Sequence, residues 1–200
     1  MPIDLQAIAL LLVLAGFTIT VGSIAYWSLK LGITPTPSSF RVRNALKPLL
    51  PEGIKNDIVE MGCGWGSLLP LLERQYPSSR IIACERSPIP WLFSRCRFYR
   101  HPGIDVRKMD IKHLDLASTG LVVCYLQKDI MKELSEHFRM HLPLNSYILT
   151  LTFHLPGWKP LKTIHATDLY NTPVYLYRKD QAPECWQTGI RVSELTSVQR

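Results

Sequence analysis

A short glycine-rich segment holds the residues of this 200-residue sequence whose types and spacing point most directly to chemistry. It reads Glu-Met-Gly-Cys-Gly-Trp-Gly over residues 60–66. Glycines there let the backbone turn tightly and approach a ligand closely. A carboxylate beside the turn would repel a pyrophosphate, but it suits S-adenosylmethionine, which carries an ammonium group, a sulfonium and no phosphate. The pattern predicts a binding site for this cofactor at Glu60, Gly62, Gly64 and Gly66.

Two further acids follow at the ends of the next two predicted strands. Glu85 lies about 20 residues beyond the glycine segment, where a carboxylate can accept hydrogen bonds from both ribose hydroxyls. Asp110 follows the third predicted strand, and we expect it to accept from the adenine amino group. A dinucleotide fingerprint is the alternative, but its third glycine position is Ser67 here.

Strand and helix signals alternate along the chain around these residues. We predict strands at residues 57–61, 80–85, 104–108, 121–126 and 146–153, and helices at residues 67–75, 88–99 and 129–141. A last strand, at residues 173–178, is predicted as an antiparallel edge. This alternation indicates an α/β fold: a doubly wound, Rossmann-like, mostly parallel sheet that binds ligands at the carboxyl ends of its strands.

Candidate catalytic residues follow the fourth and fifth strands. Methyl transfer is an in-line displacement that needs alignment and a desolvated pocket, and an amine acceptor must first lose a proton. We predict catalytic roles for Tyr125 and His154, and a substrate channel walled by Phe153 and Trp158. The alternatives are that Tyr125 caps a core strand, His154 is a loop histidine and Trp158 packs at the sheet edge. The cysteines form no C-x-x-C pair, so no metal site is expected.

The N-terminal segment predicts a single transmembrane helix. Residues 5–29 contain no charged residue, and a helix of that length crosses a bilayer core of about 30 Å. No Lys or Arg precedes the segment, which disfavours a cleaved signal peptide, and it has no polar face, which disfavours a buried core helix. Basic residues follow from Lys30 on, so the positive-inside rule places the main domain in the cytoplasm.

The chain as a whole is basic. The net charge is +7, which fits attraction to anionic lipid headgroups. The basic residues are scattered, and the densest stretch, 95–100, suits a solvated or lipid-facing side of a helix; we expect no nucleic-acid partner.

We divide the chain into a transmembrane helix at 5–29, a linker and pre-domain helix at 30–50, a catalytic domain at 51–178 and a tail at 179–200.

The chain resembles the class I, seven-stranded methyltransferases. More narrowly, it is similar to membrane-anchored protein-lysine methyltransferases that modify the ATP synthase c subunit and the adenine nucleotide translocase. The resemblance rests on the N-terminal span, Pro35–Pro37, residues 60–66, Glu85 with Ser87-Pro88, and residues 153–160. It implies methylation of a lysine near a membrane, with S-adenosylmethionine as donor. The family commonly has an acid or Ser where Cys63 and Trp65 stand here, and Asn where Ser87 stands.

Other functions remain open from the sequence. The aromatic residues near the site suit a lipid or quinone-like small molecule equally well. A nucleoside-binding module without turnover and a nucleotide-dependent oxidoreductase are the remaining classes. The predicted anchor indicates the inner membrane in a bacterium and is compatible with mitochondria in a eukaryote.

Overall fold

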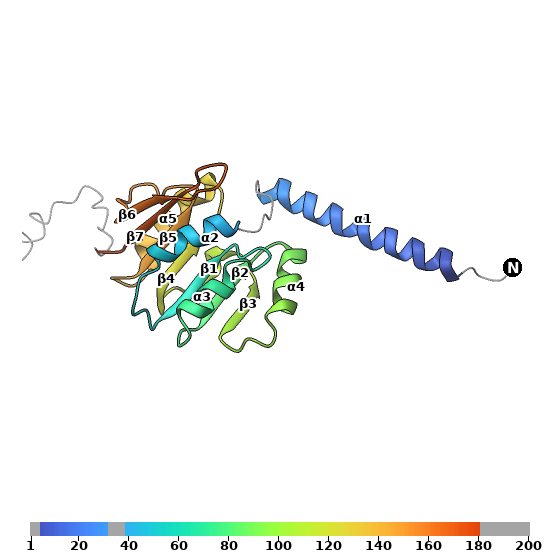
Figure 1. The fold of residues 1–200 in the computed structure, drawn as a ribbon, viewed down its shortest axis with the longest axis horizontal. Helices are drawn as coiled ribbons and strands as arrows, with labels where there is room; N and C mark the ends of the chain where they lie inside the picture. The colour runs from blue at the N-terminus through green and yellow to red at the C-terminus, as the bar shows by residue number, and fades with distance from the viewer. Residues whose placement is uncertain (1–4, 32–38, 181–200) are drawn as a thin grey trace, which may run out of the picture.

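A computed structural model describes residues 5–31 and 39–180 of the chain (Figure 1). The Pro35–Pro37 segment, and the predicted tail beyond residue 180, lie outside the described residues.

Seven strands form one sheet in the order β3-β2-β1-β4-β5-β7-β6. Their bounds are Asp57–Met61 (β1), Ile81–Glu85 (β2), Ile104–Lys108 (β3), Thr119–Cys124 (β4), Tyr147–Leu151 (β5), Lys162–His165 (β6) and Pro173–Arg178 (β7). Strands β1 to β5 are parallel, whereas β7 runs antiparallel to both β5 and β6. The sheet confirms the predicted Rossmann-like, mostly parallel architecture.

Helices alternate with these strands as the sequence predicts. They are α1 (Leu5–Leu31), α2 (Phe40–Leu46), α3 (Leu69–Gln75), α4 (Pro88–Arg97) and α5 (Lys128–His141), with short 3-10 turns η1 (Lys47–Leu49) and η2 (Ile111–His113). Proline stands in the first turn of both α3 and α4, where its missing N–H has no intrahelical partner to lose.

Both faces of the sheet are buried, and each face has its own set of helices. On one face, Ile58 of β1 joins a core that includes Leu46 of α2 and Leu72 of α3. On the other, Val59 of β1 joins a core that includes Phe138 of α5. Neighbouring residues of a strand point to opposite faces, so a doubly covered strand is apolar throughout.

Two strand predictions need correction. The strand at 173–178 lies inside the sheet, between β5 and β6, rather than at its edge. The edge is β6, which the sequence did not reveal because only Ile164 of its four residues is even half-buried and no apolar alternation marks it. The fourth strand also ends at Cys124, so Tyr125 and Leu126 lie beyond it, at the carboxyl edge of the sheet.

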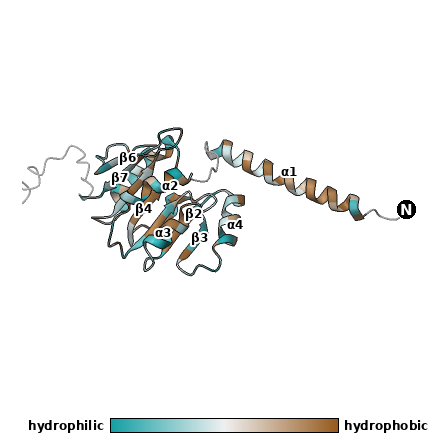
Figure 2. Ribbon diagram, viewed as in Figure 1, coloured by the Kyte–Doolittle hydropathy of each residue, from teal (hydrophilic) through white to brown (hydrophobic). Residues whose placement is uncertain are grey.

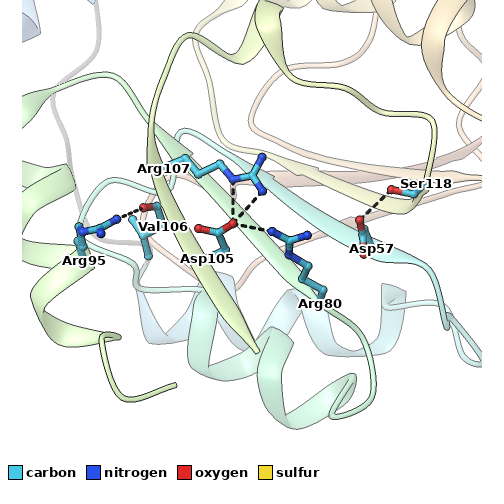
Figure 3. Close-up of polar contacts among 7 residues, drawn as sticks. All are labelled: Asp57, Arg80, Arg95, Asp105, Val106, Arg107 and Ser118. Carbon is cyan, nitrogen blue, oxygen red and sulfur yellow. Dashed lines mark hydrogen bonds and ion pairs between the residues drawn. The ribbon is translucent and has the colours of Figure 1, made fainter. Parts of the chain in front are cut away.

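The opposite edge strand, β3, is lined by charged side chains (Figure 3). The Asp105 carboxylate accepts hydrogen bonds from Arg80 at 2.8 Å and from Arg107 at 2.9 Å. Arg95 of α4 donates to the Val106 carbonyl at 3.4 Å, which ties that helix to the same strand. Charges on an edge strand disfavour pairing with another chain.

Helix α1 projects away from the sheet and is mostly hydrophobic along its length (Figures 1 and 2). By length and composition, Leu5–Lys30 could cross a membrane, and none of this stretch is buried against the domain. Its C-terminal end meets the domain beside α4, and the Arg86 guanidinium carbon lies 5.9 Å from the centre of the Trp27 ring.

Candidate functional site

A cavity of about 290 Å³ opens at the carboxyl ends of β1, β2 and β4. We call it the donor cavity. The predicted site residues that line it are Glu60, Gly62, Gly64, Glu85, Asp110 and Tyr125. Six positions spread over 66 residues of sequence thus meet at the edge where doubly wound folds bind their ligands.

The glycine turn begins directly after β1 and has a left-handed backbone. Gly62 has φ +76° and Gly64 has φ +52°, a region that costs little only for glycine. A Cβ on Gly62 would stand 2.6 Å from Cδ2 of Leu126, so the turn passes close against the end of β4. Gly66 lies behind the cavity instead, where a Cβ would meet the Phe98 ring at 2.6 Å; its space serves packing against the end of α4.

Glu85 holds the glycine turn in place with both carboxylate oxygens. Oε2 accepts from the backbone N–H of Gly64 at 2.9 Å, and Oε1 accepts from the backbone N–H of Ser87 at 2.7 Å. Each carboxylate oxygen has two lone pairs, so each can accept one more hydrogen bond. Helix α4 also holds the glycine turn, because the Ser94 hydroxyl donates to the Gly64 carbonyl at 2.6 Å.

Glu60 is a buried carboxyl group, only 4 % exposed, at the end of β1. Burial, followed by the nearby charge of Glu85, raises the pKa of Glu60 to about 8. Its Oε2 atom has no hydrogen-bond partner among the described residues. An unsatisfied acceptor in a cavity is costly unless a ligand supplies a donor, and a cationic donor suits it best. This observation fits the ammonium group of S-adenosylmethionine.

Asp110 begins η2 and is held by two contacts. One oxygen accepts from the backbone N–H of Lys112 at 3.2 Å, and the other lies 3.3 Å from the Arg86 guanidinium. Arg86 also faces Trp27 of α1, so this wall of the cavity connects to the N-terminal helix. Lys30 of α1 lines the cavity as well.

A second depression, which we call the acceptor groove, lies beside the donor cavity. Its lining residues are Lys128, Asp129, Lys132, Phe153, His154 and Pro156. Asp129 lines both hollows, so the two meet at the first turn of α5. The structure thereby brings the predicted residues Phe153 and His154 to one groove, whereas Tyr125 lines the donor cavity.

Trp158, predicted as a channel wall, lines neither hollow. Its indole N–H donates to the Ser135 hydroxyl at 3.0 Å, and its ring meets Tyr177 edge-on at 6.4 Å. It therefore packs between α5 and β7. Thr150 and Tyr177 stabilise the same region, since the Thr150 hydroxyl donates to the Phe153 carbonyl and Tyr177 accepts from the Leu155 N–H.

Sequence reasoning missed Asp129 and the approach of α1. The sequence contains a signal that could have identified Asp129 as a site residue. It is an acid in the first turn of the helix that follows a central strand, close to the carboxyl edge of the sheet. Lys30 gave no such signal, because its place beside the cavity depends on how α1 meets the domain. Across residues 5–31 and 39–180, no group of three or more His, Cys, Asp or Glu side chains could hold a metal ion.

Comparison with solved structures finds the same fold in methyltransferases. An RNA methyltransferase from Salinibacter ruber, in complex with S-adenosyl-L-homocysteine, is 19% identical and has a TM-score of 0.65; the match covers 74% of this chain and 97% of that one. The N-methyltransferase NodS from Bradyrhizobium japonicum WM9, also in complex with S-adenosyl-L-homocysteine, is 13% identical with a TM-score of 0.59, covering 72% and 90%. The comparison with curated proteins gave no match.

A comparison with protein families completes the assignment. Residues 60–162, just over half of the chain, match the family described as the ANTKMT methyltransferase domain. The match begins at Glu60 and covers every residue that lines the donor cavity except Lys30. With the fold, it identifies S-adenosylmethionine as the methyl donor. This chain is an S-adenosylmethionine-dependent methyltransferase that belongs to the ANTKMT methyltransferase family.

Proposed function

We propose that this protein transfers a methyl group to the side-chain amine of a lysine in a membrane protein. The observation that carries the proposal is Asp129, an exposed acid that lines both the donor cavity and the acceptor groove, in which Lys128 and Lys132 are the other charged residues. A carboxylate at that point attracts a cationic side chain as it approaches the methyl donor. The family resemblance supports the same substrate class.

The donor is held, in this proposal, by three carboxyl groups. Glu60 accepts hydrogen bonds from the ammonium group, Glu85 from the ribose hydroxyls and Asp110 from the adenine amine, with Gly62 and Gly64 allowing close approach. When bound, S-adenosylmethionine supplies an electrophilic methyl group on a sulfonium. Glu85 has two roles in this proposal: it binds the ribose, and it holds the backbone of the glycine turn.

The acceptor amine reaches the cavity through the acceptor groove. Phe153 gives that groove an apolar wall, which suits the methylene chain of a lysine. Tyr125, which lines the donor cavity just beyond β4, aligns the amine. His154 exposes an imidazole in the same groove and accepts the proton that the amine must lose before it attacks.

Helix α1 serves as the membrane anchor in the proposal. Residues 5–29 span the bilayer, residues 51–178 form the catalytic domain, and the positive charge that follows the helix keeps that domain on the cytoplasmic side. An anchored enzyme meets membrane-protein substrates at a high effective concentration.

The test supplies the full chain, reconstituted in bilayers, with tritiated S-adenosylmethionine and membranes from cells that lack its gene. We expect label in a protein band, and methyl-lysine in its peptides by mass spectrometry. The Glu85→Ala variant is the matched control and should transfer no label. Label in the lipid extract alone would replace the proposal with small-molecule methylation, and donor binding without any transfer would indicate a non-catalytic module.

A further inference from the structure

We propose that the outer side of α4 is a second membrane-contact surface, which lies on an anionic bilayer next to the α1 anchor. The inference rests on the anchoring role proposed for α1. It concerns a different part of the molecule, however, since α4 belongs to the catalytic domain. Four observations carry it: an unused apolar stripe, flanking cations, proximity to α1 and a link to the glycine turn.

Helix α4 has apolar residues on two sides. Its inner side packs on the sheet through buried Pro90 and Ser94. Ile89, Leu92, Phe93 and Cys96 are spaced at i, i+3, i+4 and i+7, which places them on one other side of the helix. Leu92 and Phe93 are 50 % and 49 % exposed, so this stripe is not used by the core.

Aromatic and cationic side chains extend the stripe. The Trp65 ring meets Phe93 edge-on at 5.3 Å, and Tyr99 is 70 % exposed just past the helix. Arg97 donates to the Trp65 carbonyl at 3.4 Å, while Arg100 lies 5.1 Å from the centre of the Tyr99 ring. Apolar residues bordered by aromatics and arginines are typical of helices that lie in the interface of anionic membranes.

The position of α1 places this surface at the level of the bilayer. The C-terminal end of α1 contacts α4, and Figure 1 shows α4 on the side of the domain from which α1 extends. Tyr26 and Trp27 near that end suit the membrane–water interface. When they lie at the interface, α4 reaches the headgroups of the same leaflet.

Contact with the bilayer would also affect the methyl-donor site. Ser94 lies on the inner side of α4 and holds the glycine turn through the Gly64 carbonyl. Arg86, just before α4, bridges Trp27 of α1 and Asp110 of the cavity wall. A helix fixed at the membrane surface therefore keeps the mouth of the donor cavity beside the headgroups, where a lysine at the edge of a transmembrane segment would lie.

Cys96 provides a natural reporter for the test. It is exposed on α4, whereas Cys63, Cys84 and Cys124 are buried. A fluorophore is attached to Cys96 in a Cys185→Ser background, and the full chain is reconstituted in bilayers that contain nitroxide-labelled lipid. The matched control carries the fluorophore at Leu144→Cys in a Cys96→Ser/Cys185→Ser background. Leu144 is 54 % exposed and precedes β5, at the edge of the sheet opposite the cavity.

We expect the label at Cys96 to lose most of its fluorescence and the label at Leu144→Cys to lose little. Adding phosphatidylglycerol to phosphatidylcholine should increase the loss at Cys96, and a Leu92→Ser/Phe93→Ser variant should reduce it. Equal quenching at both positions, in protein that floats with the bilayers, would overturn the α4 surface and leave the anchor intact. Protein that does not float would overturn the anchor and the α4 surface together. Quenching at Cys96 that depends on protein concentration would assign the stripe to a second copy.

Discussion

The two halves of the site are built in different ways. The proposed donor half uses the ends of β1, β2 and β3, and its three carboxyl groups lie within residues 60–110. Side chains there hold backbone atoms: Glu85 accepts from the N–H groups of Gly64 and Ser87, and Ser94 donates to the Gly64 carbonyl. The proposed acceptor half consists of exposed or half-buried side chains: Tyr125 and Asp129 lie between the end of β4 and the first turn of α5, and His154 follows β5.

This difference distinguishes the structural features that many proteins of one fold share from the features that are particular to one protein. A turn held by backbone hydrogen bonds can keep its shape while the side chains around it change. A groove made of exposed side chains can change its ligand with a single substitution, because no hydrogen-bond network constrains them. We therefore expect substitutions in the donor half to act on cofactor binding and fold stability, and those in the acceptor half to act on substrate selection.

The largest effect is expected for Glu85→Ala. The variant loses two hydrogen bonds that hold the glycine turn as well as those proposed to the ribose. Hydrogen bonds to a charged group contribute about 1.5–3 kcal/mol each, so affinity for S-adenosylmethionine should fall by about 100-fold or more. Calorimetric titration of the full chain measures this loss. Glu73→Ala, whose carboxylate contacts His101 away from the cavity, should bind normally; equal losses in both variants would contradict the role of Glu85.

Alanine substitutions in the glycine turn should differ from one another. Gly62→Ala and Gly64→Ala both place a side chain at positive φ, at about 1–2 kcal/mol each. Gly62→Ala must also displace Leu126, whereas nothing lies within 4 Å of a Cβ on Gly64. Gly62→Ala should therefore lower the free energy of unfolding by about 1 kcal/mol more, as measured by denaturant unfolding of the full chain. Equal losses would show that the turn is not held against β4.

The same contrast explains how far sequence alone could lead. Strands β1 and β3 and the glycine turn were located correctly because the apolar residues of each strand and the glycines carry their own local signals. Strand β6 was missed because it packs one half-buried residue and gains its place by pairing with β7. Carboxyl groups that follow strands could be placed at the site, since parallel strands end at a common edge.

Assignments that depended on distant contacts were less secure. Trp158 was predicted in the channel, but its position is decided by Ser135 and Tyr177, which lie far from it in sequence. Gly66 has the spacing of a ligand residue, yet its missing side chain makes room for Phe98. No sequence pattern around Lys30 predicts that the end of α1 lies beside the cavity, because this position arises from contact with α4.

The pH dependence of binding should identify Glu60 as the ammonium partner. Its pKa of about 8 means that the folded protein holds a proton which the unfolded chain loses near pH 4.5. Without cofactor, stability should therefore fall as pH rises through this window. Binding of a cation favours the ionised carboxylate, so affinity should rise by up to about tenfold per unit as pH approaches 8. Above that, the ligand's amino group loses its own proton and the rise ends.

Glu60→Gln should bind S-adenosylmethionine more weakly, with a flatter profile of affinity against pH between pH 6 and 8. An unchanged slope in this variant would assign the titration to another group.

The smallest effect is expected in the acceptor half, for Asp129→Asn. Asp129 is exposed, so its attraction for a lysine side chain is that of a surface ion pair, about 0.2–1 kcal/mol. KM for a lysine acceptor should rise by about 1.4- to fivefold, while kcat changes little. Glu136→Gln on the same helix, away from both hollows, is the matched control.

Salt separates this charge effect from a loss of shape. Exposed charges are screened beyond about 3 Å at 1 M ionic strength, so the KM values of the native protein and Asp129→Asn should converge as salt is raised. A difference that persists at high salt would mean that Asp129 organises the groove rather than attracting the substrate. A loss of the same size with an uncharged acceptor would mean that the groove selects for shape, and the acceptor half would then resemble the donor half in being built by fixed contacts.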